Sequence, residues 1–182
     1  MPRIAPITGK QDVKPEHHAV VDQVQKVFNN VRGPFSVLLH SPELAERVLP
    51  LVTFFREKSV VPDKLRSVAI LSAVREKEAA YVWAAQVGAA RRAGMSESTI
   101  DVLRAKGDPS SLPAEERDIV VYTRELMRTN KASQGAFDTL HKKYGTQWLV
   151  ELTAAANYFA LLSGVVNAFE VAAPADGDKL PA

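Results

Sequence analysis

Hydrophobic residues recur at steps of three and four along most of the chain. From residue 16, valine or phenylalanine occupies positions 20, 24, 27, 28 and 31, which places these side chains on one face of a helix. The same spacing predicts helices near residues 42–55, 63–75, 78–92, 96–103, 115–129, 133–144 and 146–171, and one or two helical turns within 35–40. No segment alternates as a half-buried strand does. The pattern therefore predicts an all-α fold, a single-domain bundle of seven to nine helices.

Local signals set several boundaries. Ser41-Pro42-Glu43 has a capping hydroxyl, a proline and an acid in the order typical of a helix start. Gly94 is predicted to end the helix at 78–92. Pro50 lies inside a helical pattern, so we expect a kink or a split there. Lys106–Pro113 combines glycine, proline and serine and is predicted to be a loop.

The ends of the chain lack periodicity. We expect a flexible N-terminal arm at residues 1–14, the helical domain at 15–173, and a loose tail at 174–182. At 182 residues and 46% apolar content the chain suits one globular domain. The run Leu152–Phe169 is uncharged and long enough to raise a membrane span, but Asn157 and Asn167 within it favour a helix in the protein core.

Composition excludes some chemistry. The chain has no cysteine, which rules out disulfides and a thiolate nucleophile and fits a cytoplasmic protein. The net charge of +2, with both signs interspersed, argues against a nucleic-acid partner. Neither metal-ligand spacing nor a glycine-rich phosphate loop is present, so we expect no metal and no cofactor.

Four stretches in the same order resemble the carboxymuconolactone decarboxylase family, which shares its fold with alkyl hydroperoxidase D. They are LLHSPEL (38–44), PDKLRSVAIL (62–71), YVWAAQVGAARRAGMS (81–96) and the last helix, LVELTAAANYFALLSGVVNAFEV (149–171). The resemblance implies an all-α subunit that forms a homo-oligomer, a trimer or hexamer, with pockets near subunit contacts. The chain would be a cysteine-less member.

The departures from the family pattern concern its chemistry. The two cysteines of the hydroperoxidase members align with Ala79 and Val82, and their histidine aligns with Gln86. Cysteine-less members have a glutamate where Val82 stands, and an acid of the preceding helix aligns with Ser67. Peroxide reduction by a thiol is therefore excluded, and the decarboxylase interpretation loses its usual proton donor.

The remaining candidates on the helix at 78–92 each have a plainer explanation. Gln86 could orient a substrate carbonyl or carboxylate, or simply bridge helices as a buried amide. Tyr81 and Trp83 could form the wall of a pocket, with the Tyr81 hydroxyl as a weak acid, or pack in the core. Val82 and Ser67 would line the same pocket if the alignment holds.

Charged and titratable candidates follow. Glu78, one turn before Val82, is the nearest substitute for the missing carboxylate, although a solvated acid in a first helical turn is common. Arg91, like Arg75 and Arg92, could bind a substrate carboxylate or remain solvated. His40 could titrate near neutral pH beside the central helices or be structural.

Two functions remain open, and a third is suggested only by the presence of basic residues. The first is a lyase of the decarboxylase type acting on a small carboxylated lactone or aromatic-derived acid, with Gln86, Tyr81, Glu78 and His40 as catalytic candidates. The second is a non-catalytic oligomeric binding or scaffold relative that has lost the acid/base residues. The third is nucleic-acid binding through basic residues. We expect a small carboxylic acid or lactone as partner, and neither nucleic acid nor membrane.

Overall fold

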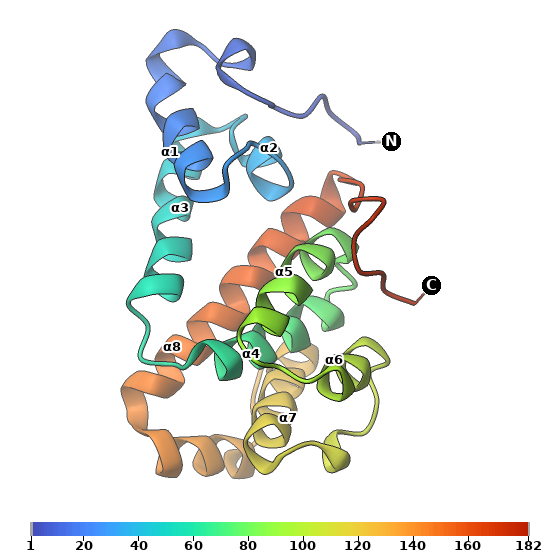
Figure 1. Cartoon of the computed structure of the whole chain (residues 1–182). Helices are drawn as coiled ribbons and strands as arrows, with labels where there is room; N and C mark the ends of the chain where they lie inside the picture. The colour runs from blue at the N-terminus through green and yellow to red at the C-terminus, as the bar shows by residue number, and fades with distance from the viewer. Residues whose placement is uncertain (1, 182) are drawn as a thin grey trace.

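The computed structural model describes residues 2–181 and confirms the all-α prediction. Within that range it has eight α-helices, three short 3-10 helices and no strand (Figure 1). The α-helices are α1 (His18–Phe28), α2 (Pro34–Leu38), α3 (Pro42–Glu57), α4 (Asp63–Glu76), α5 (Ala80–Arg92), α6 (Glu97–Arg104), α7 (Ala114–Thr129) and α8 (Gln134–Ala168). The 3-10 helices are η1 (Lys10–Asp12), η2 (Pro15–His17) and η3 (Pro109–Ser111).

Helix α4 lies at the centre of the fold. Its residues are apolar on nearly every side, and those from Leu65 to Arg75 are buried with the exception of Ser67. It packs against α8, α7 and α5 (Figure 1). The sequence therefore identified the central helical pair, α4 and α5, from its alanine-rich and apolar pattern.

Helix α8 contains a break that the sequence had indicated. Gly145 has φ 83° and ψ 175°, a conformation that interrupts the helix between Tyr144 and Thr146. Tyr144 and Trp148 stack across the break at 4.0 Å between ring centroids. Among residues 2–181, α8 alone is long and apolar enough to cross a membrane, but half of its most apolar window is buried, and it packs against α4 and α7. Here it serves as a core helix.

Pro50 does not split its helix. Of the two outcomes expected, a kink or a split, the split does not occur: α3 runs from Pro42 to Glu57 with Pro50 inside it. Pro50 is exposed, whereas Val48, Val52 and Phe55 are buried. The proline removes one backbone hydrogen bond on the solvent side, and burial of the opposite face holds the helix together.

Both terminal segments contact the helical domain, in contrast to the loose ends expected. Ile7 is buried, and its amide donates to the Ser36 carbonyl at 2.9 Å. The Arg3 amide donates to the Phe169 carbonyl at 3.0 Å, next to the end of α8. The C-terminal segment runs back along α5 toward α6 (Figure 1). Short segments of this kind carry no periodic signal, so the sequence pattern could not reveal these contacts.

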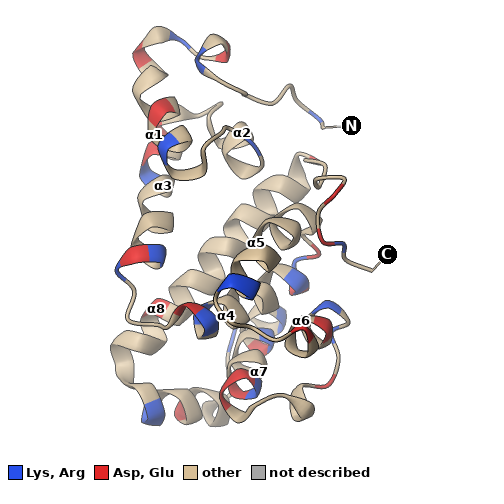
Figure 2. Cartoon of the chain, viewed as in Figure 1, with Lys and Arg blue, Asp and Glu red and all other residues tan. Residues whose placement is uncertain are grey.

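Charged residues of both signs are spread over the helices (Figure 2). One carboxylate is buried among cations: the Glu76 side chain is 7% exposed and accepts from Arg128 Nε and Nη2 at 2.8 and 2.7 Å. Arg124 Nε lies 3.7 Å from the same carboxylate. This group joins the end of α4 to α7.

Candidate functional site

The turn between α4 and α5 decides which side chains of α5 face the same way. Glu78 has φ 52°, a left-handed conformation, and Ala79 forms the N-cap of α5. The helix therefore begins at Ala80 rather than at Glu78. From there, Val82 and Gln86 lie one turn apart on one side of α5, with Tyr81 beside them.

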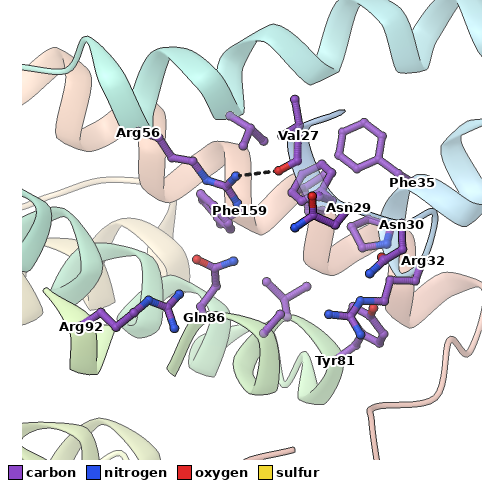
Figure 3. Close-up of a pocket in the computed structure, with 16 residues that line it drawn as sticks. Val27, Asn29, Asn30, Arg32, Phe35, Arg56, Tyr81, Gln86, Arg92 and Phe159 are labelled. Carbon is purple, nitrogen blue, oxygen red and sulfur yellow. Dashed lines mark hydrogen bonds between the residues drawn. The ribbon is translucent and has the colours of Figure 1, made fainter. Parts of the chain in front are cut away.

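These three residues line a cavity of about 320 Å³ between α5, α3, α8 and the connection from α1 to α2 (Figure 3). Its walls come from segments far apart in the sequence. The lining residues are Val27, Phe28, Asn29, Asn30, Arg32, Pro34, Phe35, Val52, Arg56, Tyr81, Val82, Ala85, Gln86, Arg92, Phe159 and Leu162.

Two kinds of surface meet in this cavity. Phe35, Val52, Phe159 and Leu162 are buried and give it apolar walls. Its polar groups are amides, one phenol and guanidinium groups, and no acidic side chain lines it. The cavity can therefore accommodate the apolar body of a ligand while presenting only positive charge and neutral hydrogen-bonding groups to it.

Three arginines supply the positive charge: Arg32, Arg56 and Arg92. None of them forms an ion pair with another residue of the described range, 2–181. Arg56 Nη1 donates to the Val27 carbonyl at 3.4 Å, and its guanidinium lies 5.1 Å from the centroid of the Phe28 ring. These contacts orient Arg56. Like Arg32 and Arg92, Arg56 is exposed as a residue, so the three arginines stand where the cavity meets solvent.

The surroundings act on the pKa of two groups. Partial burial lowers the pKa of Arg56, and the charge of Arg92 contributes to the lowering. Burial raises the pKa of Tyr81, and the nearby Arg32 offsets only part of this effect. Tyr81 therefore keeps its proton at neutral pH and presents an O–H donor.

Two amides of the site are also without partners. Asn30 Oδ1 is buried and accepts no hydrogen bond from the described residues. Gln86 is half-buried, with its amide between the side chains of Arg92 and Arg56 in Figure 3, and it forms no side-chain hydrogen bond within residues 2–181. Buried polar groups normally have partners, so unpaired amides beside a cavity indicate room for a ligand or water.

Gly33 holds the wall of the cavity next to Tyr81. Its φ of 59° and ψ of −137° fall in a region open to glycine and strained for other residues. A Cβ atom at this position would lie 2.2 Å from Tyr81 Cε1. The backbone at residue 33 therefore approaches the Tyr81 ring as closely as only glycine permits.

The structure places five of the sequence candidates outside the cavity. Glu78 is not on α5, and its carboxylate pairs with Arg75 and Lys106; the hydrogen bond from Lys106 contributes most to lowering its pKa. His40 is exposed, and its Nε2 lies 2.9 Å from the Ala5 carbonyl oxygen. A turn between α4 and α5 was expected, but the left-handed conformation of Glu78 and the contact of the N-terminal segment with His40 were not.

The other three lie elsewhere on α4 and α5. Trp83 is fully buried and donates its indole N–H to Asp178 Oδ1 at 3.0 Å. Arg91 pairs with Glu97 and Asp178. Ser67 is half-buried on α4 and is not among the residues that line the cavity. Of the eight candidates, only Tyr81, Val82 and Gln86 come together.

Four residues of the cavity were not predicted from the sequence: Asn29, Asn30, Arg32 and Arg56. Arg92 was predicted only as one of several basic residues. A signal was present for Arg56, which follows Val52 by one turn and so borders the buried face of α3. The polar segment from Asn29 to Arg32 between two apolar helices was another. In residues 2–181 no group of three or more histidines, aspartates or glutamates is placed to hold a metal ion.

No protein-family model matches the chain, and no curated protein matches its sequence. Among solved structures, it is similar to ATU0492 of Agrobacterium tumefaciens, a protein of unknown function whose description assigns it provisionally to the antioxidant defence proteins named AhpD. The TM-score is 0.66 at 17% sequence identity, and the match covers 76% of this chain and 96% of the other. This similarity shows that the chain has an AhpD-like fold.

Proposed function

We propose that the protein binds a small organic acid in the cavity between α3, α5 and α8. One observation carries the proposal: three guanidinium groups line a single cavity, and none has an acidic partner among residues 2–181. Arg56 and Arg92 are close enough for their charges to repel, and their exposure to solvent weakens that repulsion. A bound anion would relieve that repulsion, and a guanidinium can grip a carboxylate through two parallel hydrogen bonds.

Size and lining support a small ligand with an apolar body. The cavity, at about 320 Å³, lies at the low end of the range for small-molecule sites. A ring or short chain would contact Phe35 and Phe159, while its carboxylate would face the guanidinium groups. An acid derived from an aromatic compound, or a carboxylated lactone, has this combination.

The polar groups occupy two sides of the cavity. Arg56, Arg92 and Gln86 lie on one side, and Tyr81 and Arg32 lie on the other (Figure 3). A ligand with a carboxylate at one end and a carbonyl or second acid at the other would use both sides. The resemblance to the carboxymuconolactone decarboxylases, together with the AhpD-like fold, is compatible with such a ligand.

A lyase activity is the second candidate, and Tyr81 is the observation that favours it. Tyr81 is the one residue with a hydroxyl group among those that line the cavity, so it is the candidate proton donor there. Burial raises its pKa and makes it a weaker acid, so it would donate only to a strongly basic carbanion. In a decarboxylation the bond to the carboxyl carbon breaks, carbon dioxide leaves, and the electron pair left on carbon takes up a proton. Tyr81 would donate that proton, and Gln86 would orient the substrate carbonyl.

A thermal-shift screen of aromatic acids, lactone acids and their neutral methyl esters tests the proposal. Ligand at one hundred times its Kd adds about 2.7 kcal/mol to the free energy of unfolding, which is readily measured. We expect hits among the acids and none among the esters. A folded protein that responds to no acid would contradict the proposed function.

Turnover of any hit separates the two candidates. Carbon dioxide release that is lost in Tyr81→Phe, with ligand affinity retained, would establish the lyase. Binding without release of carbon dioxide would leave the protein as a non-catalytic binding relative.

A further inference from the structure

A second group of cation and N–H donors converges on one carboxylate, away from the cavity. Asp178, in the C-terminal segment, accepts from Trp83 Nε1 at 3.0 Å, from Arg91 Nη2 at 3.0 Å, and from Arg104 Nη2 at 3.0 and 3.2 Å. The donors come from α5 and α6, so three separate segments meet at this point. Neither Trp83, Arg91 nor Arg104 lines the cavity.

Asp178 is well enclosed for a residue so near the end of the chain. Its side chain is 15% exposed, and the Trp83 side chain beneath it is fully buried. Burial alone would raise the pKa of Asp178, but hydrogen bonds from Trp83, Arg104 and Arg91 outweigh it, and the pKa lies below its ordinary value. Asp178 is therefore ionised at neutral pH, and both of its carboxylate oxygens accept hydrogen bonds.

The rest of this segment has no regular structure and makes few polar contacts. Residues 172–181 contain no helix or strand, and the neighbouring carboxylate, Asp176, is exposed and forms no ion pair within the described chain. Gly177 packs closely on α5, because a Cβ atom there would lie 2.8 Å from Ala84 Cβ. Leu180, two residues after Asp178, packs against the hydrophobic core. The segment is therefore docked through Asp178, the close approach at Gly177 and the apolar contact of Leu180.

The two arginines that contact Asp178 each have another acidic partner. Arg91 also pairs with Glu97, and Arg104 also pairs with Asp101, both from α6. The carboxylate of Asp178 therefore adds to a set of two cations and two anions rather than neutralising a bare positive patch. Partly exposed contacts of this kind are individually weak.

We propose that Trp83, Arg91 and Arg104 form a carboxylate-binding site that recognises an acidic peptide segment, and that the protein's own C-terminal segment occupies it reversibly through Asp178. Recognition requires a carboxylate that reaches the indole N–H and both guanidinium groups, with a small residue before it to lie against Ala84. When the segment leaves, the Trp83 N–H loses its acceptor and becomes accessible to solvent. The site is independent of the proposed function of the cavity.

Fluorescence of Trp83 in the full-length chain tests this. Trp148 is replaced by phenylalanine so that Trp83 is the one remaining tryptophan, and quenching by acrylamide, a neutral probe, reports access to it. Asp178→Ala is compared with Asp176→Ala, which removes the same charge two residues away. We expect severalfold stronger quenching in Asp178→Ala and no change in Asp176→Ala.

A peptide added in trans provides the decisive comparison. A synthetic peptide of residues 174–182 should restore protection of Trp83 in the Asp178→Ala protein, whereas the same peptide with asparagine for Asp178 should not. Equal quenching of the two variants would overturn the proposal. So would strong quenching in Asp178→Ala that neither peptide reverses, because it would mean that Asp178 only supports the local structure.

Discussion

Replacing Gly33 with alanine should disturb both the stability of the protein and its cavity. Gly33 has a positive φ, and a methyl group there would overlap the Tyr81 ring, with contacts of 2.2 Å to Cε1 and 2.5 Å to Cζ. Both atoms belong to a ring that is buried against the wall of the cavity. The ring cannot accommodate the methyl group without moving.

The cost has two parts. Holding a residue other than glycine in this backbone region costs about 1–3 kcal/mol. Displacing a packed ring costs about 1–3 kcal/mol more. Even the lower sum, about 2 kcal/mol, corresponds to a fall in Tm of about 4–8 °C for a domain of this size.

Urea denaturation of Gly33→Ala and Gly164→Ala measures this difference. Gly164 lies within α8 and has no positive φ. A Cβ atom added at this position would have no neighbouring atom within 4 Å. Alanine there should stabilise the protein by about 0.5–1 kcal/mol through helix propensity alone. If Gly33→Ala were as stable as the parent protein, the close approach of residue 33 to Tyr81, and with it the shape of the cavity wall, would be refuted.

Two further predictions concern buried carboxylates. Glu76→Gln should lower the free energy of unfolding by about 2–4 kcal/mol, because it leaves the buried Arg124 without its counter-charge. The half-exposed Arg128 contributes less to this loss. An unchanged midpoint in chemical denaturation would contradict the prediction. Glu151 accepts from the Val60 amide at 2.8 Å and from Gln147 at 3.0 Å, and although burial acts to raise its pKa, these bonds bring the pKa below the ordinary value of 4.5. Its contribution to stability is therefore present above that value and is lost as the pH falls through the lower pKa of the folded state. The stability difference between the parent and Glu151→Gln should be largest near neutral pH and should narrow on acidification, and a difference that stays constant in denaturation across the acid range would contradict this.

Much of the fold was accessible from the sequence because helix formation leaves local signals. Apolar spacing located α1, α4 and α7. Ser96 and Ser133, at the predicted starts of two helices, each accept a backbone N–H there, whereas Ser41 occupies the N-cap of α3 without a side-chain capping bond. The break at Gly145 was also predicted, because glycine is the residue that most readily ends a helix with a positive φ. Pro50 did not divide α3, because burial of the opposite face outweighed the local helix-breaking propensity.

The site was less accessible because it depends on contacts between distant segments. Gln86, Tyr81 and Val82 lie on one helix, so their neighbourhood could be inferred. The approach of Arg56 from α3 and Arg32 from the α1–α2 connection is a property of the tertiary structure. Glu78 lies outside the cavity because its left-handed conformation places it before α5, which begins at Ala80. The apolar pattern contains no signal for this shift in the start of the helix.

Isothermal titration of the strongest acid from the screen, with Arg56→Gln and Arg47→Gln compared with the parent, tests the central claim most directly. Both arginines lie on α3, but Arg47 does not line the cavity; its exposed guanidinium donates to the Glu43 carbonyl at 2.8 Å and lies 3.9 Å from the Glu43 carboxylate. A hydrogen bond to a charged group contributes about 1.5–3 kcal/mol, so Arg56→Gln should weaken binding by roughly 10- to 150-fold. Arg47→Gln should leave the affinity unchanged. Equal affinity of the two variants would show that the guanidinium groups of the cavity do not hold the acid.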